Sequence, residues 1–222
     1  MDIIVALAIF DLDNTLIAGD SDHGWGEFLI EQGKVDAALY AEKNDYYFQQ
    51  YQSGQLDILE YLEFSLLPLT QIPLPELLSL RSQFVSDKIL PLIPKKSREL
   101  IKKHKDQGDF LLIITATNLF VTEPIAKELA VDDIIATDPE QIDGQYTGKV
   151  SGIPSFQDGK VKRLTTWLSH NGLSLEGSYF YSDSRNDLPL LKQVDYPVAV
   201  DADETLTAYA KQHNWPIISL RD

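Results

Sequence analysis

Short apolar runs alternate with stretches of helical periodicity along most of the chain. Five runs are apolar almost throughout, as is typical of strands covered on both faces of a parallel sheet: Ile3–Phe10, Leu111–Ile114, Ile134–Ala136, Tyr179–Tyr181 and Pro197–Val200. Helical patterns separate or follow these runs: Lys95–Lys105, Val121–Ala130, Lys160–His170, Asp187–Gln193 and Glu204–His213. The alternation predicts an α/β fold built on a Rossmann-like, doubly wound parallel sheet.

Two segments interrupt this alternation. Between Ser21 and Leu92 the apolar residues recur at helical spacing in four successive segments, with no convincing strand. We interpret residues 21–92 as an inserted helical cap, and residues 1–20 and 93–222 as the Rossmann-like core. A shorter interruption, Ile142–Val150, carries Asp143-Gly144 between alternating residues and predicts a β-hairpin.

The first apolar run leads directly into Asp11-Leu12-Asp13-Asn14-Thr15. In a doubly wound sheet, ligands bind at the carboxyl ends of the strands, so two carboxylates at this position are placed for chemistry. Asp11 is the candidate nucleophile, because a carboxylate can attack a phosphoryl group to form an aspartyl-phosphate. Asp13 can protonate the leaving group and then deprotonate the attacking water. The alternative is that Asp-x-Asp simply forms a polar loop.

Three later segments repeat the pattern of an apolar strand followed by a group suited to phosphate or metal: Leu111–Thr115, Asp158–Val161 with Lys160, and Tyr179–Asp183 continuing to Asp187. In this order and spacing, the four segments resemble the haloacid dehalogenase superfamily over nearly the whole chain. Narrower similarities to the phosphoserine-phosphatase-like branch, which includes histidinol-phosphate phosphatases, lie in Gly19–Asp22, Thr115–Asn118, Asp143–Gly148 and Tyr181–Asp187. The resemblance implies a phosphohydrolase.

Several further side chains complete the expected site. Asp11, Asp183 and Asp187, with the backbone carbonyl of Asp13, form an oxygen-rich set suited to Mg²⁺. Thr115 can hold a phosphate oxygen after its strand, and Lys160 can neutralise the phosphoryl group during transfer. The alternative interpretations are that Asp183 and Asp187 cap the following turn and helix, and that Lys160 is a surface lysine. The branch resemblance adds Asn186 as a substrate or phosphate contact.

Charge and composition limit the partners and the compartment. The 222 residues carry 19 basic and 34 acidic side chains, a formal charge of −15, which repels nucleic acid and anionic membrane surfaces. The charge also calls for a divalent cation if an anionic phosphomonoester is to enter. The chain has no Cys, and Ile3–Phe10 is too short to span a bilayer. We therefore expect a cytoplasmic protein without stable membrane association, either a monomer or a homodimer.

Cap residues should select the leaving group. Asp20, near Asp22, His23 and Trp25, can bind a substrate amine, although a helix N-cap is an equally good interpretation. The cap cations are few (Lys34, Lys43, Arg81 and Lys88), and none lies where the branch would place a partner for the phosphoserine carboxylate. This favours an amine-bearing phosphate without a carboxylate, such as histidinol phosphate, over phosphoserine.

Alternative functions share the same site residues. Whether Arg81 reaches the substrate stays open, as does the role of the aromatic residues Tyr46, Tyr47, Phe48 and Tyr51, which can enclose an apolar group or pack helices. A phosphotransferase, a lysophospholipid-type phosphatase and a non-enzymatic binding module remain alternatives to a small-metabolite phosphatase.

Overall fold

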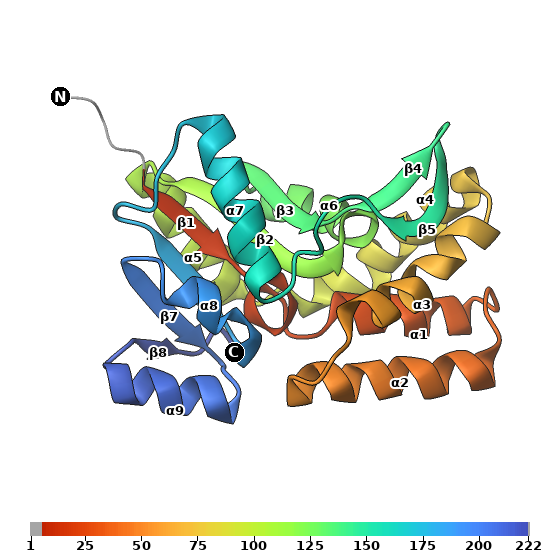
Figure 1. Ribbon diagram of the computed structural model, residues 1–222, viewed down its shortest axis with the longest axis horizontal. Helices are drawn as coiled ribbons and strands as arrows, with labels where there is room; N and C mark the ends of the chain where they lie inside the picture. Colours follow the sequence, from red (N-terminus) through yellow and green to blue (C-terminus); the bar gives the residue numbers. More distant parts are fainter. Residues whose placement is uncertain (1–5, 222) are drawn as a thin grey trace.

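Six strands form one parallel sheet in the computed structural model, which describes residues 6–221 (Figure 1). Their order across the sheet is β3 (Asp133–Thr137), β2 (Phe110–Asn118), β1 (Leu7–Phe10), β6 (Tyr179–Ser182), β7 (Tyr196–Val200) and β8 (Ile217–Ile218). The chain winds from β1 outwards through β2 and β3, and then returns to β6 and winds the other way. The direction therefore reverses beside β1, where doubly wound folds bind ligands.

Helices cover both faces of the sheet. On one face, Ala8 and Phe10 of β1 pack with α5 (Lys95–Gln107) and α6 (Leu119–Leu129). On the other face, Leu7 and Ile9 pack with α7 (Asp158–Asn171), α8 (Leu188–Leu191) and α9 (Glu204–His213). Every described residue of β1 is fully buried, because successive side chains of one strand enter opposite apolar layers. The doubly wound α/β fold expected from the sequence is confirmed.

Three boundaries differ from the sequence prediction. The strand β2 continues past Ile114 to Asn118, with a register irregularity between these residues, so that Thr115 lies within the strand. The helix expected at Asp187–Gln193 is shorter, since a 3-10 turn over Arg185–Asp187 precedes α8. The short edge strand β8 carries too few apolar residues to be recognised by pattern. The predicted strand residues Ile3–Val5 lie outside the described part of the chain.

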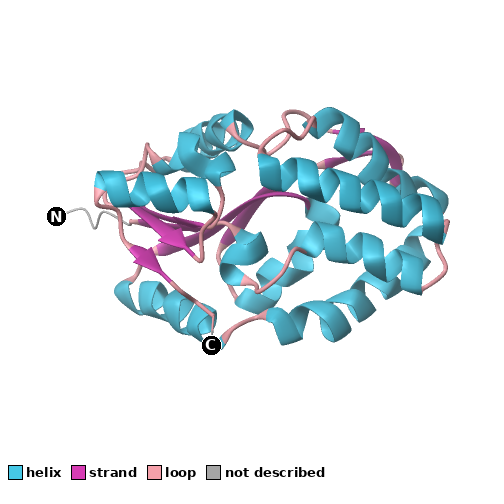
Figure 2. Ribbon diagram, turned by 90° about the horizontal axis from the view of Figure 1, so that it is seen from below, coloured by secondary structure: helices cyan, strands magenta, loops and turns pink. Residues whose placement is uncertain are grey.

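Four helices lie beside the sheet, in the segment that the sequence predicts to be a cap (Figure 2). They are α1 (Ser21–Glu31), α2 (Ala37–Ser53), α3 (Ile58–Gln71) and α4 (Leu74–Phe84), followed by the short turns Val85–Ile89 and Leu90–Leu92. The two chain crossings lie side by side, because the Ala18 N–H donates to the Leu92 carbonyl at 2.7 Å. We keep the division into a 21–92 cap and a 1–20 and 93–222 core as a proposal, since apolar residues of both parts share one continuous cluster.

The predicted hairpin is present and lies against the cap. Strands β4 (Pro139–Ile142) and β5 (Gln145–Val150) pair antiparallel. Asp143 and Gly144 between them both have positive φ, 51° and 77°, as a two-residue type I′ turn requires. The strand β5 packs against α3, so an excursion from the core sequence closes one side of the cap (Figure 1).

Among residues 6–221, no helix combines the length and apolar character needed to cross a bilayer.

The glycine before Lys160 allows α7 to begin close to the preceding loop. A Cβ on Gly159 would lie 2.0 Å from the Pro154 carbonyl oxygen, a distance that requires the backbone to move. We expect Gly159→Ala to cost about 1–3 kcal/mol of stability, or roughly 2–12 °C in Tm. Thermal unfolding measures this loss. Gly24→Ala is the matched control, because its Cβ would meet only Phe84 ring atoms at 3.7 Å; equal Tm losses in both variants would contradict the steric explanation.

Candidate active site

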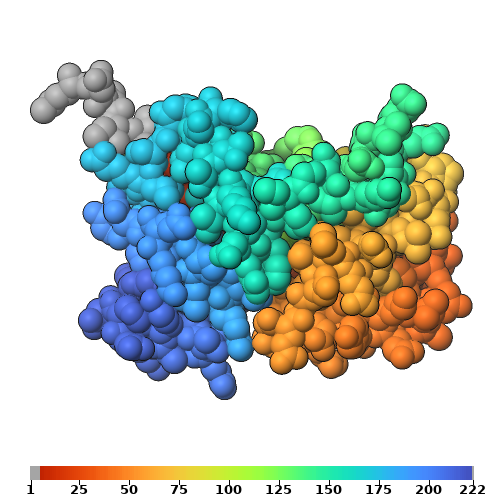
Figure 3. Space-filling view, viewed as in Figure 1, coloured from red at the N-terminus to blue at the C-terminus, as the bar shows by residue number. Residues whose placement is uncertain are grey.

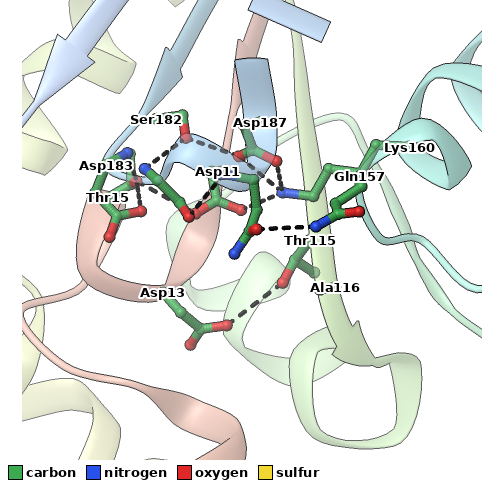
Figure 4. Close-up of polar contacts among 12 residues, drawn as sticks. Asp11, Asp13, Thr15, Thr115, Ala116, Gln157, Lys160, Ser182, Asp183 and Asp187 are labelled. Atoms are coloured by element: carbon green, nitrogen blue, oxygen red, sulfur yellow. Dashed lines mark hydrogen bonds and ion pairs between the residues drawn. The ribbon is translucent and has the colours of Figure 1, made fainter. Parts of the chain in front are cut away.

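The two aspartates after β1 lie where three neighbouring strands end. Asp11 continues the sheet, since its N–H donates to the Tyr181 carbonyl of β6 at 2.9 Å. Its side chain is buried, with 3% of the residue exposed. The chain then turns tightly over Leu12–Leu16, with Asn14 in the left-handed region at φ 55°. This turn directs Asp13 towards β2 and leaves Asp11 facing β6 and α7 (Figure 4).

Lys160 is the counter-ion of this carboxylate group. Its Nζ donates to Asp11 Oδ1 at 2.7 Å and to Asp187 Oδ2 at 2.9 Å, and 1% of the residue is exposed (Figure 4). Lys160 is the third residue of α7, where the helix dipole disfavours a cation. Burial alone would lower the pKa of Lys160, but the two carboxylates outweigh it and raise the pKa. The surface-lysine interpretation is therefore wrong.

Thr15 and Ser182 orient the remaining carboxylates. Thr15 Oγ1 lies 3.1 Å from Asp183 Oδ1 and 3.3 Å from Asp11 Oδ2, and it accepts the Asp183 N–H at 3.0 Å. Ser182 Oγ donates to Asp187 Oδ2 at 2.7 Å. Sequence reasoning did not single out either hydroxyl. The position of Thr15, two residues after Asp13 in the same turn, was a usable signal.

Hydroxyl groups from β2 hold Asp13. Thr117 Oγ1 donates to Asp13 Oδ2 at 2.8 Å, and Thr115 Oγ1 makes a longer contact of 3.4 Å to the same oxygen. The Ser21 N–H donates to Asp13 Oδ1 at 2.6 Å. Thr117 was missed by the sequence analysis, although it lies two residues beyond Thr115 on the same strand and so shares its face. The structure thus brings Asp13 and Thr115 together as expected, through a strand longer than predicted.

The carboxylates raise one another's pKa. Burial raises the pKa of Asp11 to about 7, with Asp187 and Asp13 adding to the effect and Lys160 opposing it. Burial also raises the pKa of Asp13 to about 6, with Asp20 contributing. The pKa of Asp183 is well above its ordinary value, first through burial and then through Asp11 and Asp187. One lysine therefore does not offset the negative charge of this group.

The carboxylate oxygens described above suit a hard cation. Their arrangement differs from the one expected from the sequence. Asp187 is held by Lys160 and Ser182, whereas Asp11 and Asp183 share Thr15 on the other side. Within residues 6–221, no group of three acidic or histidine side chains is already spaced to hold a metal ion. The oxygens of Asp11 and Asp183 and the Asp13 carbonyl are the donors that suit Mg²⁺, with Asp187 beside them as a partner of Lys160.

The last two predicted site residues, Asn186 and Asp20, lie where the core meets the cap, and Asp20 is the helix N-cap that the sequence offered as one interpretation. Asn186 bridges core and cap, because its Nδ2 donates to the Tyr51 carbonyl of α2 at 3.2 Å and its Oδ1 accepts from Gln157 Nε2 at 3.0 Å. Asp20 is the N-cap of α1, accepting the Asp22 and His23 N–H groups at 3.0 and 2.8 Å. Its carboxyl also faces the pocket described next.

A pocket lies between the cap helices and the strand ends. Four acidic residues line it (Asp11, Asp13, Asp20 and Asp22), and four aromatic residues, which we call the aromatic wall, line it as well (Tyr47, Phe48, Tyr51 and Tyr61). Of the described residues that line it, His23 alone is basic. The free volume at the centre is about 40 Å³, enough for a few waters. Figure 3 shows the cap surface abutting the core on the face drawn there.

The cap cations make contacts outside this pocket. Arg81 donates to the Phe120 carbonyl at 2.9 Å and lies over the Phe120 ring, 4.7 Å from its centroid. Lys34 and Lys88 form ion pairs with Glu76 and Glu31. Lys43 lies 5.8 Å from the Phe64 ring centroid. Of the aromatic residues left open by the sequence, Tyr46 is 52% exposed, whereas Tyr47, Phe48 and Tyr51 face the pocket.

Comparisons with known proteins identify the family of this chain. A family model described as haloacid dehalogenase-like hydrolase matches residues 8–192. A histidinol-phosphatase of Neisseria meningitidis is 43% identical over 219 residues, covering 97% of this chain and 99% of the relative. A phosphoserine phosphatase of Mycobacterium tuberculosis is 30% identical over 233 residues, covering 98% of this chain and 72% of that protein.

Solved structures share the fold. A protein of unknown function from Bordetella pertussis Tohama I, 41% identical, superposes with a TM-score of 0.92 over 98% of this chain and 99% of that one. A phosphoserine phosphatase structure, described as a phospho-aspartyl intermediate analogue, has a TM-score of 0.71 over 98% and 94% of the two chains. At 19% identity, that second likeness concerns the fold alone.

Removing the buried lysine tests the charge balance. In Lys160→Met, Asp11 and Asp187 share a buried site without a counter-charge, which should cost about 3–5 kcal/mol at pH 8. A carboxyl whose pKa is raised by folding binds protons more tightly in the folded state, so stability rises as the pH falls. Lys160 lowers the pKa of Asp11, so this pKa should lie above the wild-type value of about 7 in the variant, and the Tm deficit should shrink as the pH falls from 8 to 5.

The exposed neighbour Lys162 in the same helix supplies the control. Lys162→Met should unfold like the wild type at both pH values. A deficit in Lys160→Met that is the same at pH 5 and pH 8 would mean that lost packing, not lost charge, is responsible.

Proposed function

The chain belongs to the haloacid dehalogenase-like hydrolases and is a phosphatase of that family, and we propose that it transfers a phosphoryl group from a small phosphomonoester to Asp11 and then to water. One observation carries the proposal: the Asp11 carboxylate sits at the end of β1, paired with Lys160 at 2.7 Å and followed by Asp13 at the floor of the pocket.

Asp11 and Asp13 divide the chemistry. A carboxylate oxygen of Asp11 attacks phosphorus, forming an aspartyl-phosphate as the bond from phosphorus to the leaving oxygen breaks. Asp13 gives its proton to that oxygen and later takes one from the water that hydrolyses the aspartyl-phosphate. The Ser21 N–H and the Thr117 hydroxyl hold the Asp13 carboxyl in one orientation for both steps.

Lys160, Thr115 and a divalent cation balance the phosphoryl charge. Lys160 carries a fixed positive charge next to the attacking oxygen, and the Thr115 hydroxyl lies at the same strand end. Asp11, Asp183 and the Asp13 carbonyl would hold Mg²⁺, with Asp187 positioning Lys160. When bound, the metal supplies positive charge that lets an anionic substrate approach anionic carboxylates and stabilises the charge during transfer.

The pocket supports an amine-bearing substrate, with histidinol phosphate as our proposal. Its acidic and aromatic lining offers no arginine or lysine, among the residues described there, for the carboxylate of phosphoserine. Histidinol phosphate instead carries an amine and an imidazole, which Asp20 and the aromatic wall can receive. The 43% identical relative is named a histidinol-phosphatase. Phosphoserine is the second candidate, because a 30% identical relative is named for it.

Substrate entry would require the cap to move. A free volume of about 40 Å³ is too small for a phosphomonoester of this size. The Asn186 contact to the Tyr51 carbonyl links the core to the cap, and the chain crossings that meet at Ala18 and Leu92 would form the hinge. Closure would exclude water from the aspartyl-phosphate until Asp13 activates one molecule. A cytoplasmic location is part of this proposal, in keeping with a soluble metabolite and a chain without Cys.

Substitution of the two aspartates tests the division of roles. Asp11→Asn should lower turnover at least about 10³-fold, because the amide is a poor nucleophile. Asp13→Asn should lose about 10²–10⁴-fold with alkyl phosphates, yet still form phosphorylated protein from an aryl phosphate whose leaving group needs no proton. Phosphate release and intact mass measure these outcomes. The exposed Asp106→Asn is the control, and full turnover in Asp11→Asn, with deamidation excluded by mass, would sink the covalent mechanism.

A substrate panel tests the reaction class and the metal. Histidinol phosphate, phosphoserine, lysophosphatidate and an aryl phosphate are compared, with Mg²⁺ and with a chelator. We expect magnesium-dependent phosphate release that is fastest with histidinol phosphate, and recovery of activity when Mg²⁺ is restored. Added alcohols that capture the phosphoryl group in place of water would instead identify a phosphotransferase. Failure with every compound would favour a binding module.

A further inference from the structure

One partly buried carboxylate in the pocket has no part in the chemistry described above. Asp22 is the second residue of α1 and lines the pocket on the cap side. Its Oδ1 receives a long hydrogen bond of 3.4 Å from Asn118 Nδ2, at the end of β2. Tyr61 of α3 lies near the same carboxyl. Asp22 therefore lies where the cap meets the core, in the same pocket as Asp11 and Asp13.

Asp20 and Asp22 differ in how their charges are stabilised. Asp20 Oδ1 accepts two backbone N–H groups of α1, so the N-terminus of the helix stabilises that carboxylate. Within residues 6–221, no backbone N–H, lysine or arginine donates to the Asp22 carboxyl. His23, the nearest basic side chain in sequence, directs Nε2 to Asp45 at 3.2 Å and Nδ1 towards Glu27 at 3.7 Å.

The surroundings of Asp22 are negative. Burial raises the pKa of Asp22 to about 8, and Asp20 and Asp13 add to this while Tyr61 partly offsets it. The pocket's own groups therefore leave this carboxyl poorly compensated. Such an arrangement costs stability, and a cationic ligand would offset that cost more than a neutral one.

We propose that Asp22 is a specificity-determining residue, which binds a positively charged nitrogen of the leaving group and so selects cationic phosphomonoesters. The inference rests on the proposed function, because it assigns a role within the same pocket. Tyr61 and the aromatic side chains of α2 would face the same group, and aromatic rings attract cations through their faces. Asp22 takes no part in proton or phosphoryl transfer, which Asp11 and Asp13 perform.

The first arm of the test compares leaving groups of different charge. Values of kcat/KM are measured for histidinol phosphate and for an aryl phosphate without a cationic group, in the wild type, Asp22→Asn and Glu31→Gln. The ratio of the two values should fall roughly 10- to 100-fold in Asp22→Asn, mainly through a higher KM for histidinol phosphate. Glu31, on the same helix, pairs with the surface residue Lys88, so its variant should keep the wild-type ratio.

The second arm measures binding without turnover. Calorimetry with histidinol, which lacks the phosphoryl group, should show at least about tenfold weaker binding to Asp22→Asn than to the wild type or Glu31→Gln. An equal loss of activity on both phosphates would indicate a structural role and overturn the inference. Histidinol binding that is absent from the wild type, or unchanged in Asp22→Asn, would overturn it as well.

The two arms separate this inference from the proposed function. If the wild type hydrolyses the aryl phosphate but not histidinol phosphate, the proposed substrate is wrong. The calorimetric arm then still decides whether Asp22 binds a cationic amino alcohol. If the wild type hydrolyses neither compound, the phosphatase proposal fails, and binding of histidinol through Asp22 stands or falls separately.

Discussion

The buried ion pair of Lys160 with Asp11 and Asp187 is the constraint on which the site depends. Carboxylates gathered at the ends of β1 and β6 repel one another, and burial raises the pKa of Asp11 and Asp183 further. Lys160 reaches both Asp11 and Asp187 because Gly159 lets α7 start in contact with the Pro154 carbonyl. The absence of a side chain at Gly159 thus allows Lys160 to pair with two buried carboxylates that would otherwise repel each other.

The surroundings of the two ends of the pocket differ. Next to the strand ends, Lys160 pairs with Asp11, and under the proposed function it would give the phosphoryl group a cationic neighbour. At the cap end, Asp20, Asp22 and the aromatic rings line the pocket, and none of its described lining residues is a lysine or an arginine. In a chain with a formal charge of −15, Asp11 at one end of the pocket therefore has a lysine partner, and the acidic side chains at the other end have none among the described lining residues. An anionic phosphate and a cationic leaving group on one small molecule match these two ends.

The sequence predicted the elements whose signals are local. Near-continuous apolar runs identified the central strands, and Asp143-Gly144 identified the hairpin because two adjacent residues with positive φ need such side chains. The extension of β2 to Asn118 was missed, because polar residues there pair with β3 through a register irregularity that no pattern records. Asp187 was expected as a metal ligand, and the structure places it between Lys160 and Ser182.

The sequence by itself determined the doubly wound α/β class, and it predicted a helical cap inserted after the first strand and a set of site residues. These follow from periodicity and from side chains at strand ends, which are local properties. Only the tertiary structure decided which groups meet: Thr15 between Asp11 and Asp183, Thr117 on Asp13, Arg81 against Phe120 rather than the pocket, and Asp22 facing it. These contacts join residues from different elements, and their geometry depends on how cap and core pack together, which the spacing of residues along one chain does not specify.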